Sequence, residues 1–123
     1  MDVYFDGKCG ICSREIAHYR SLRGAEDIRW HDIASDASPL RTIGVSQADA
    51  LLALHVRRDD GSVAKGAEAF AALWSRFPRW RLLAHLVSLP GVSQLAALAY
   101  DAFAQRRFAR LDHCQAAARS ANG

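Results

Sequence analysis

The ten residues from Val3 to Cys12, VYFDGKCGIC, constrain the fold of this chain more than any other segment. A short apolar run reaches an Asp-Gly turn, two cysteines follow with two residues between them, and the next segment has helical spacing. A strand therefore delivers the cysteine pair to the N-terminus of a helix. There the free N–H groups and the positive end of the helix dipole favour a thiolate over a thiol. This layout is typical of a redox-active dithiol, whose sulfurs at positions i and i+3 are close enough to form a disulfide.

The size and the cysteine content of the chain narrow the class of protein. Its 123 residues are enough for one compact domain with its own core. Three cysteines, two of them clustered, do not make a disulfide scaffold. Met1 leads directly into the strand-like run, so we expect no secretory signal and a cytoplasmic location. We expect a single domain over residues 1–111 and a frayed tail over residues 112–123.

Apolar periodicity and turn signals predict the element order β-α-β-α-β-β-α, followed by two further helices. The expected strands are residues 3–5, 28–33, 54–58 and 62–65, the last two joined by an Asp-Gly hairpin turn. The expected helices are residues 9–22, 47–53, 67–77, 80–89 and 92–111. Because a βαβ crossover is right-handed, the first two strands run parallel. These elements predict an α/β, thioredoxin-like core with additional C-terminal helices.

The C-terminal half of the chain carries a surplus of positive charge. From residue 76 onward seven arginines stand against two aspartates, namely Arg76, Arg79, Arg81, Arg106, Arg107, Arg110 and Arg119 against Asp101 and Asp112. Such a surplus suits an acidic partner, an anionic membrane or nucleic acid, or simply a solvated basic helix face. No metal-finger spacing, aromatic RNP pattern or heptads with a basic region accompany it. We therefore expect a solvated helix face and no nucleic-acid partner.

The segment Asp6-Gly7-Lys8-Cys9-Gly10-Ile11-Cys12 resembles the motif of the DCC family of predicted thiol-disulfide oxidoreductases, which is named for its Asp and two Cys. The resemblance runs from Val3 to about Cys114. It includes His55-Val56, Asp60-Gly61, residues 66–70, Leu89-Pro90-Gly91-Val92, Tyr100 and residues 105–110. It implies a thioredoxin-like fold and dithiol–disulfide exchange, and it does not supply a substrate.

The two cysteines of the motif have different expected roles. We expect Cys9 to be the nucleophile, because it comes first in the motif and lies at the helix N-terminus. Lys8 adds a positive charge beside it. Cys12, one helical turn further on, is the expected resolving thiol, which attacks the mixed disulfide and releases the reduced substrate. A pair of inert buried cysteines is the alternative, and the Asp-Gly-Lys turn before Cys9 argues against it.

Residues around the pair have supporting roles. Asp6 is a proton acceptor for Cys12 or a turn residue that accepts backbone N–H bonds, and the two roles are compatible. Gly7 supplies backbone freedom or a close approach. Cys114, which follows His113, is expected to be an exposed tail cysteine without a role, with an additional resolving or regulatory cysteine as the alternative. The remaining histidines are expected to be structural, namely His18, His31, His55 and His85.

One feature of thioredoxins is missing from this sequence. Thioredoxins carry a cis-proline just before the third strand, facing the dithiol. The prolines of this chain are Pro39, Pro78 and Pro90, and none of them precedes the strand that begins near His55. The DCC family differs from thioredoxin in the same way. The expected fold therefore stands, whereas substrate binding by the thioredoxin route does not.

The sequence supports three functional hypotheses. The leading one is a small thiol-disulfide oxidoreductase that cycles Cys9 and Cys12 between dithiol and disulfide, without a cofactor, on a thiol- or disulfide-containing substrate. The second is a metal-binding module in which Cys114 and a histidine complete half a zinc site, although adjacent His113 and Cys114 are poorly placed to bind one ion. The third is a membrane-peripheral adaptor, without a transmembrane segment, whose apolar helices over residues 80–104 lie on a membrane surface. The sequence assigns no oligomeric state.

Overall fold

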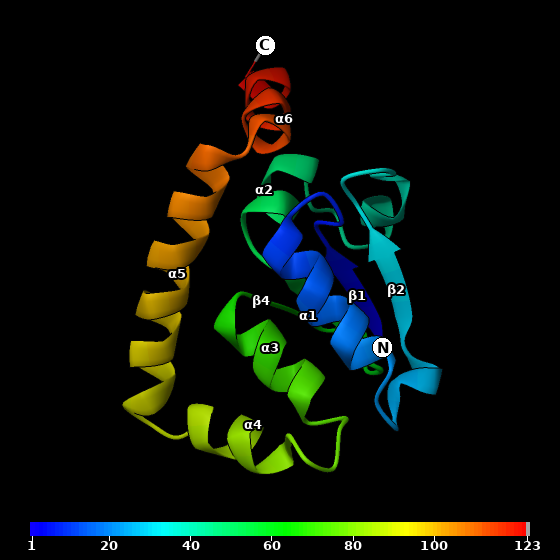
Figure 1. The fold of residues 1–123 in the computed structure, drawn as a ribbon, viewed down its shortest axis with the longest axis vertical. Helices are drawn as coiled ribbons and strands as arrows, with labels where there is room; N and C mark the ends of the chain where they lie inside the picture. Colours follow the sequence, from blue (N-terminus) through cyan, green and yellow to red (C-terminus); the bar gives the residue numbers. More distant parts are fainter. Residues whose placement is uncertain (123) are drawn as a thin grey trace.

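The computed structural model describes residues 1–122, of which the last two are described by their backbone alone. At its centre is a four-stranded sheet with the strand order β2-β1-β3-β4 (Figure 1). Strand β1 (Asp2–Phe5) pairs in parallel with β2 (Arg29–Asp32) and antiparallel with β3 (His55–Arg57), and β3 pairs antiparallel with β4 (Val63–Lys65). The parallel β1–β2 pair and the hairpin give the thioredoxin-like α/β fold that the sequence predicts.

Six α-helices surround this sheet in the described part of the chain. The first five match predicted helices, and the sixth was not predicted. They are α1 (Gly10–Arg20), α2 (Gln47–Leu52), α3 (Ala67–Trp74), α4 (Arg81–Val87), α5 (Val92–Arg110) and α6 (Asp112–Asn122). The predicted strands and helices are present, β1 beginning one residue earlier than predicted and the others having shorter ends. Two short 3-10 helices, Ala25–Asp27 and Ser38–Thr42, lie in segments where we predicted no regular structure.

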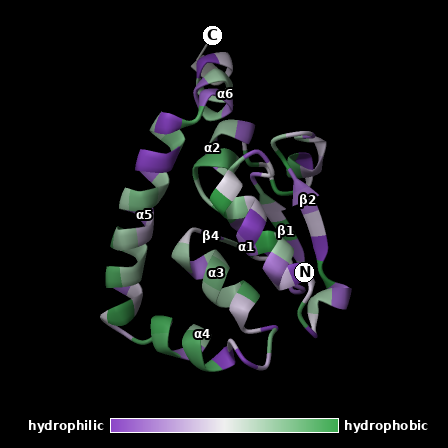
Figure 2. Ribbon diagram, in the orientation of Figure 1, coloured by the Kyte–Doolittle hydropathy of each residue, from purple (hydrophilic) through white to green (hydrophobic). Residues whose placement is uncertain are grey.

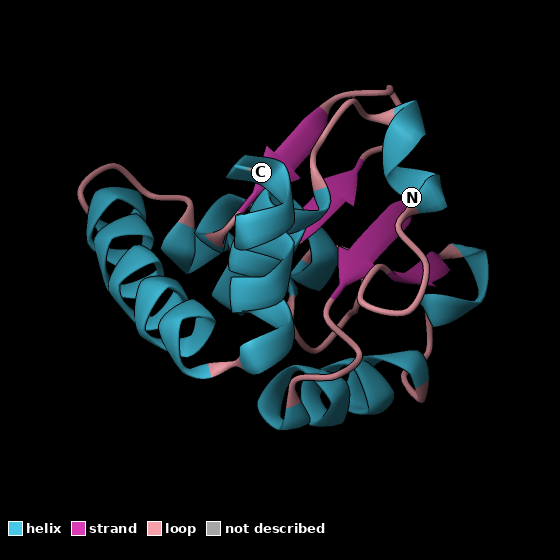
Figure 3. Cartoon of the chain, turned by 90° about the horizontal axis from the view of Figure 1, so that it is seen from above, coloured by secondary structure: helices cyan, strands magenta, loops and turns pink. Residues whose placement is uncertain are grey.

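The sheet separates two apolar cores, because successive side chains of a strand point to opposite faces. Val3 and Phe5 of β1 belong to the first core, with α1 and α3 covering that face. Tyr4 belongs to the second core, which contains Leu51 of α2 and Cys114 of α6. Figure 3 shows helices on both sides of the strands. The end of α5 reaches the second core as well, because Phe108 packs against it.

The C-terminal segment corrects one expectation. The sequence predicts a frayed tail over residues 112–123, but Asp112–Asn122 form α6. Cys114 is fully buried in the second core, and Ala117 packs against the same core. The buried face of α6 is made of small side chains, so it lacks the stripe of large apolar residues by which a packed helix is recognised in a sequence.

Helices α4 and α5 form a bent arm along one side of the molecule (Figure 1). The Tyr100 hydroxyl of α5 fixes this arm to the core by accepting a hydrogen bond from the backbone N–H of Leu54 at 2.9 Å. Much of this arm has hydrophobic residues (Figure 2). Large apolar side chains are exposed along it, namely Leu82, Leu86, Leu89, Val92, Leu95, Leu98 and Phe103. Among the described residues, no single helix is long and apolar enough to cross a membrane; α4 and α5 meet that test only as a pair, bent by 95° at their junction.

Candidate active site

Cys9 is the N-cap residue of α1. Its backbone is extended, and its sulfur accepts a hydrogen bond from the backbone N–H of Cys12 at 3.4 Å. No disulfide joins the two cysteines, and both thiols are free in this structure. The first turn of α1 thus directs an N–H donor and the positive end of the helix dipole at the Cys9 sulfur, which is the geometry that stabilises a thiolate.

The turn before Cys9 is held in place by Asp32 at the end of β2. The Asp32 carboxylate accepts hydrogen bonds from the backbone N–H groups of Gly7 at 2.9 Å and Ala34 at 3.1 Å. A Cβ atom at Gly7 would overlap this carboxylate, so the close approach requires glycine. The Ser13 hydroxyl donates to the Gly7 carbonyl at 2.7 Å. The motif segment is therefore clamped between β2 and α1, and neither Asp32 nor Ser13 was among the residues the sequence singled out.

The two thiols of the pair have different surroundings. The Cys9 residue is only 3% exposed, whereas Cys12 is half-buried. Burial raises the pKa of the Cys12 thiol to about 12, and its hydrogen bond with Cys9 acts in the same direction, whereas the positive charge of Arg107 opposes the shift. Cys12 is therefore protonated near neutral pH, and it needs a base in order to react as a thiolate.

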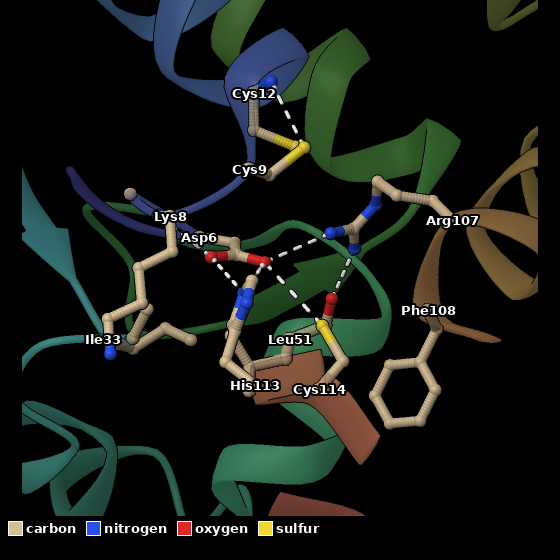
Figure 4. A network of polar contacts seen from close by, with 12 residues as sticks. Asp6, Lys8, Cys9, Cys12, Ile33, Leu51, Arg107, Phe108, His113 and Cys114 are labelled. Atoms are coloured by element: carbon tan, nitrogen blue, oxygen red, sulfur yellow. Dashed lines mark hydrogen bonds and ion pairs between the residues drawn. The ribbon is translucent and has the colours of Figure 1, made fainter. Parts of the chain in front are cut away.

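Asp6 is the buried carboxylate at the centre of the site, with a side chain that is 2% exposed (Figure 4). It accepts a hydrogen bond from the backbone N–H of Lys8 at 3.0 Å, which is a turn interaction. It also forms an ion pair with Arg107 at 3.0 Å, and the Nε2 atom of His113 lies 2.9 and 2.8 Å from its two oxygens. The Cys114 thiol donates to the same carboxylate at 3.7 Å. The geometry is thus compatible with both roles that the sequence left open for Asp6.

Arg107 of α5 supplies the positive charge of the site. Its guanidinium donates to Asp6 and to the carbonyl oxygens of Leu51 and Leu52, which lie shortly before β3. Burial acts to lower the pKa of Arg107, but the negative charges of the cysteine pair and of Asp6 raise it overall. The Lys8 side chain, by contrast, is exposed and points away from the cysteines (Figure 4). The charge that we expected from Lys8 comes from Arg107 instead.

Two sequence-based assignments in this region are wrong. We placed Arg107 on a solvated basic helix face and Cys114 on an exposed tail, but Arg107 is 9% exposed and Cys114 is fully buried. The burial of Arg107 could have been predicted from its spacing. It lies three residues after Ala104 and seven after Tyr100, on the face of α5 that packs against the core. An arginine on a buried helix face requires an acidic partner.

For the metal-binding alternative, the structure brings three possible ligand groups together but pairs one of them with an arginine. Ligand atoms of Asp6, His113 and Cys114 lie within 4.8 Å of one another, so the adjacent His113 and Cys114 do converge, contrary to our expectation. However, Arg107 already occupies one oxygen of Asp6 with a buried positive charge. Burial, followed by the charge of Asp6, raises the pKa of the Cys114 thiol to about 11, and this thiol donates to Asp6 at 3.7 Å. The cluster therefore favours an ion-paired polar network over a metal centre.

A cavity of about 350 Å³ opens beside the cysteine pair, between α1, α3 and α5. Cys12, Asp6 and Arg107 form part of its wall, and Glu15 is a further charged residue there. Most of the remaining wall is apolar and aromatic, including Phe5, Ile11, Ile16, Leu54, Phe70, Trp74, Tyr100 and Phe103. The arrangement combines a cysteine pair at a helix N-terminus, a buried carboxylate and an apolar chamber in one place, which is compatible with thiol chemistry on a bound molecule.

The sequence model of the DCC1-like thiol-disulfide oxidoreductases matches residues 3–112 of this chain. The matched segment contains the cysteine pair, Asp6, all of the sheet except Asp2, and the helix that carries Arg107. The chain belongs to this family.

This DCC1-like chain is also similar to an uncharacterized chloroplastic protein of Arabidopsis thaliana, At5g50100, with 29% identity over 109 residues. The similar segment makes up 87% of this chain and 50% of the Arabidopsis protein, so the DCC1-like chain spans about half the length of this relative. No solved structure matches the chain.

The buried ion pair predicts a large difference between two neighbouring arginines. Replacing Arg107 by Leu leaves the Asp6 carboxylate buried without its counter-charge, and we expect the free energy of unfolding to fall by about 3–5 kcal/mol. The matched control Arg106→Leu changes an exposed side chain of the same helix and should shift stability by less than about 0.5 kcal/mol. Urea unfolding of the reduced proteins measures both values. Equal effects of the two substitutions would contradict a structural role for the Asp6–Arg107 pair.

Proposed function

We propose that this DCC1-like protein exchanges thiols and disulfides through the Cys9–Cys12 pair. The observation that carries the proposal is the position of Cys9 at the N-cap of α1, where its sulfur accepts the backbone N–H of Cys12. The same N–H groups and helix dipole that stabilise a Cys9 thiolate also make it a good leaving group when the disulfide is reduced. A cytoplasmic location, where thiols are kept reduced, is part of this proposal.

The proposed reduction of a substrate disulfide has two steps. The Cys9 thiolate attacks one sulfur of the substrate, the substrate S–S bond breaks, and the first half of the substrate leaves as a thiolate. Cys12 then attacks the Cys9 sulfur of the mixed disulfide, which forms the Cys9–Cys12 disulfide and releases the second half as a thiolate. Two electrons pass from the dithiol to the substrate. One product thiolate takes up the proton that Cys12 loses, and the other takes up the proton that Cys9 released to solvent when it ionised. The reverse sequence oxidises a dithiol substrate.

Asp6 is the proposed base for the second step. Cys12 needs such a base because burial keeps its thiol protonated near neutral pH. Asp6 is buried, lines the same cavity as Cys12, and is held in place by Arg107. His113 lies against both oxygens of Asp6 with a side chain that is 21% exposed, so it offers the carboxylate a contact with solvent. The proton of Cys12 therefore has an acceptor inside the protein.

The first test is the reduction potential of the pair, measured by thiol trapping in defined glutathione buffers. We expect a single two-electron transition that is lost in Cys9→Ser and in Cys12→Ser and kept in Cys114→Ser, because Cys114 is not part of the proposed pair. In the presence of a substrate disulfide, Cys12→Ser should accumulate a mixed disulfide on Cys9. Absence of a Cys9–Cys12 disulfide across the whole buffer range would refute the proposal. A mixed disulfide that forms on Cys12 in Cys9→Ser, and not on Cys9 in Cys12→Ser, would reverse the two roles.

Asp6→Asn tests the proposed base. Loss of the carboxylate should slow resolution of the mixed disulfide by about 10²-fold or more while leaving the first attack by Cys9 unchanged within about threefold. Stopped-flow mixing with acid quench and mass spectrometry separates the two steps. The control is Asp2→Asn, which removes another buried carboxylate of the sheet, paired with Arg29 at 2.8 Å and remote in function from the thiols. Similar slowing in both variants would assign the effect to general destabilisation and remove Asp6 from the mechanism.

A second candidate function uses the bent arm of α4 and α5. Its exposed apolar side chains include Leu95 and Leu98, and the exposed Arg106 and Arg110 follow on the same helix. Apolar residues flanked by basic ones favour an adaptor that lies on an anionic membrane surface. If so, the protein should float with liposomes that contain anionic lipid, and Leu95→Glu should abolish flotation without affecting the redox transition. Failure of the wild-type protein to float would exclude this second function.

A further inference from the structure

The cavity beside Cys12 carries an inference about the substrate, which rests on the proposed function. We propose that this cavity is the substrate site of the Cys9–Cys12 pair and that it takes a small disulfide with uncharged, apolar arms in preference to charged disulfides such as that of glutathione. The argument uses the size of the cavity, the composition of its wall and the exposure of Cys9.

The position of the cavity connects it to the chemistry. Cys12 is part of its wall, and the backbone N–H of Cys12 lies 3.4 Å from the Cys9 sulfur. A disulfide bound in the cavity therefore contacts Cys12, whose backbone N–H binds the Cys9 sulfur. The volume of about 350 Å³ lies at the lower end of the range of about 300–1,000 Å³ that small-molecule sites occupy. A small molecule fits this space, and a folded protein does not.

The exposure of Cys9 supports the same conclusion. Cys9 is only 3% exposed, so its sulfur is not accessible at the molecular surface to the disulfide of a folded protein. Ile11, which is 58% exposed, and Phe103, which is 47% exposed, both line the cavity. A small, uncharged molecule loses little hydration when it meets such apolar side chains.

The charges in the wall set the preference for an uncharged substrate. Asp6 and Arg107 compensate each other as an ion pair at 3.0 Å, so neither is free to bind a charged group. Glu15 adds a negative charge, and the Tyr19 hydroxyl that donates to it at 2.9 Å does not neutralise it. The rest of the wall is mainly apolar and aromatic, including Phe5, Ile16, Phe70, Trp74 and Tyr100. An anionic substrate arm would lose its hydration here and face a like charge.

The exchange in the cavity balances as in the general mechanism. The Cys9 thiolate forms a bond to one sulfur of the small disulfide, and the other alkyl thiolate leaves. Cys12 then bonds to Cys9 and displaces the second alkyl thiolate. Each alkyl thiolate takes up one proton, so one disulfide and the protein dithiol give two alkyl thiols and the Cys9–Cys12 disulfide.

The test uses two disulfides of matched length, dipropyl disulfide and the dianionic 3,3′-dithiodipropionate. The reduced protein, freed of reductant, is mixed with each one, and loss of the dithiol is followed by thiol trapping. Rates are normalised to those of dithiothreitol with the same compounds, which removes the intrinsic difference between them. We expect the protein to prefer dipropyl disulfide by about tenfold or more, and insulin disulfides to react more slowly than dipropyl disulfide. No preference, or faster reaction with insulin, would overturn the inference.

Substitutions in the cavity wall test whether the preference for dipropyl disulfide arises in the cavity. Ala96 of α5 lies in the cavity wall, so Ala96→Phe, or the smaller change Ala96→Leu, should reduce the dipropyl disulfide rate by about tenfold and leave the 3,3′-dithiodipropionate rate and the reduction potential unchanged. The matched control Ala99→Phe places the same side chain on the exposed side of α5 and should alter neither rate. Glu15→Gln should raise the rate with the dianionic compound by about twofold or more.

The outcomes separate this inference from the proposed function. If the Cys9–Cys12 disulfide forms in glutathione buffers but Ala96 variants and Ala99→Phe react alike, the redox function holds and the cavity is not the substrate site. If no Cys9–Cys12 disulfide forms at all, the proposed function fails, and the inference fails with it.

Discussion

The buried pair of Asp6 and Arg107 is the interaction on which the arrangement of this molecule depends. Asp6 is attached to the end of β1, and Arg107 comes from α5, 101 residues further along the chain. A carboxylate taken out of water without a counter-charge is strongly unfavourable, so the fold that buries Asp6 must also bring a cation to it. Arg107 fills this requirement and at the same time binds the carbonyl oxygens before β3. The C-terminal helices are thereby part of the site and not an appendage to it.

The same pair explains how one small site can hold two cysteines with different tasks. The N-terminus of α1 provides Cys9 with a donor from the backbone. Cys12 receives no comparable help, and burial keeps it protonated until a base accepts its proton. The ion pair holds a carboxylate in that neighbourhood while compensating its charge, so the carboxylate is present without making the interior anionic. The proposed catalytic base is thus also one partner of the stabilising ion pair.

The path of the C-terminal arm also creates the cavity. α5 stands away from the core and is fixed to it by Tyr100 near its middle and by Arg107 towards its end. The space left between α5 and helices α1 and α3 is lined by the side chains of all three. The extension beyond the minimal fold thus decides the shape of the space at the dithiol.

The local parts of this protein followed from its sequence. The alternating and helical apolar patterns predicted the strands, the helices α1 to α5, the parallel β1–β2 pair and the β3–β4 hairpin, because these depend on contacts within short stretches of chain and on the handedness of one crossover. The placement of Cys9 at a helix start followed from the Asp-Gly turn and the spacing after it. By contrast, Arg107 and Cys114 were misassigned, and Asp32 was not noticed, because their roles consist of contacts with residues far away in the sequence. The sequence determines which side chains are charged or apolar. Whether a charged side chain is solvated or buried against a partner is decided only by the tertiary structure, because it depends on which distant segments of the chain pack together.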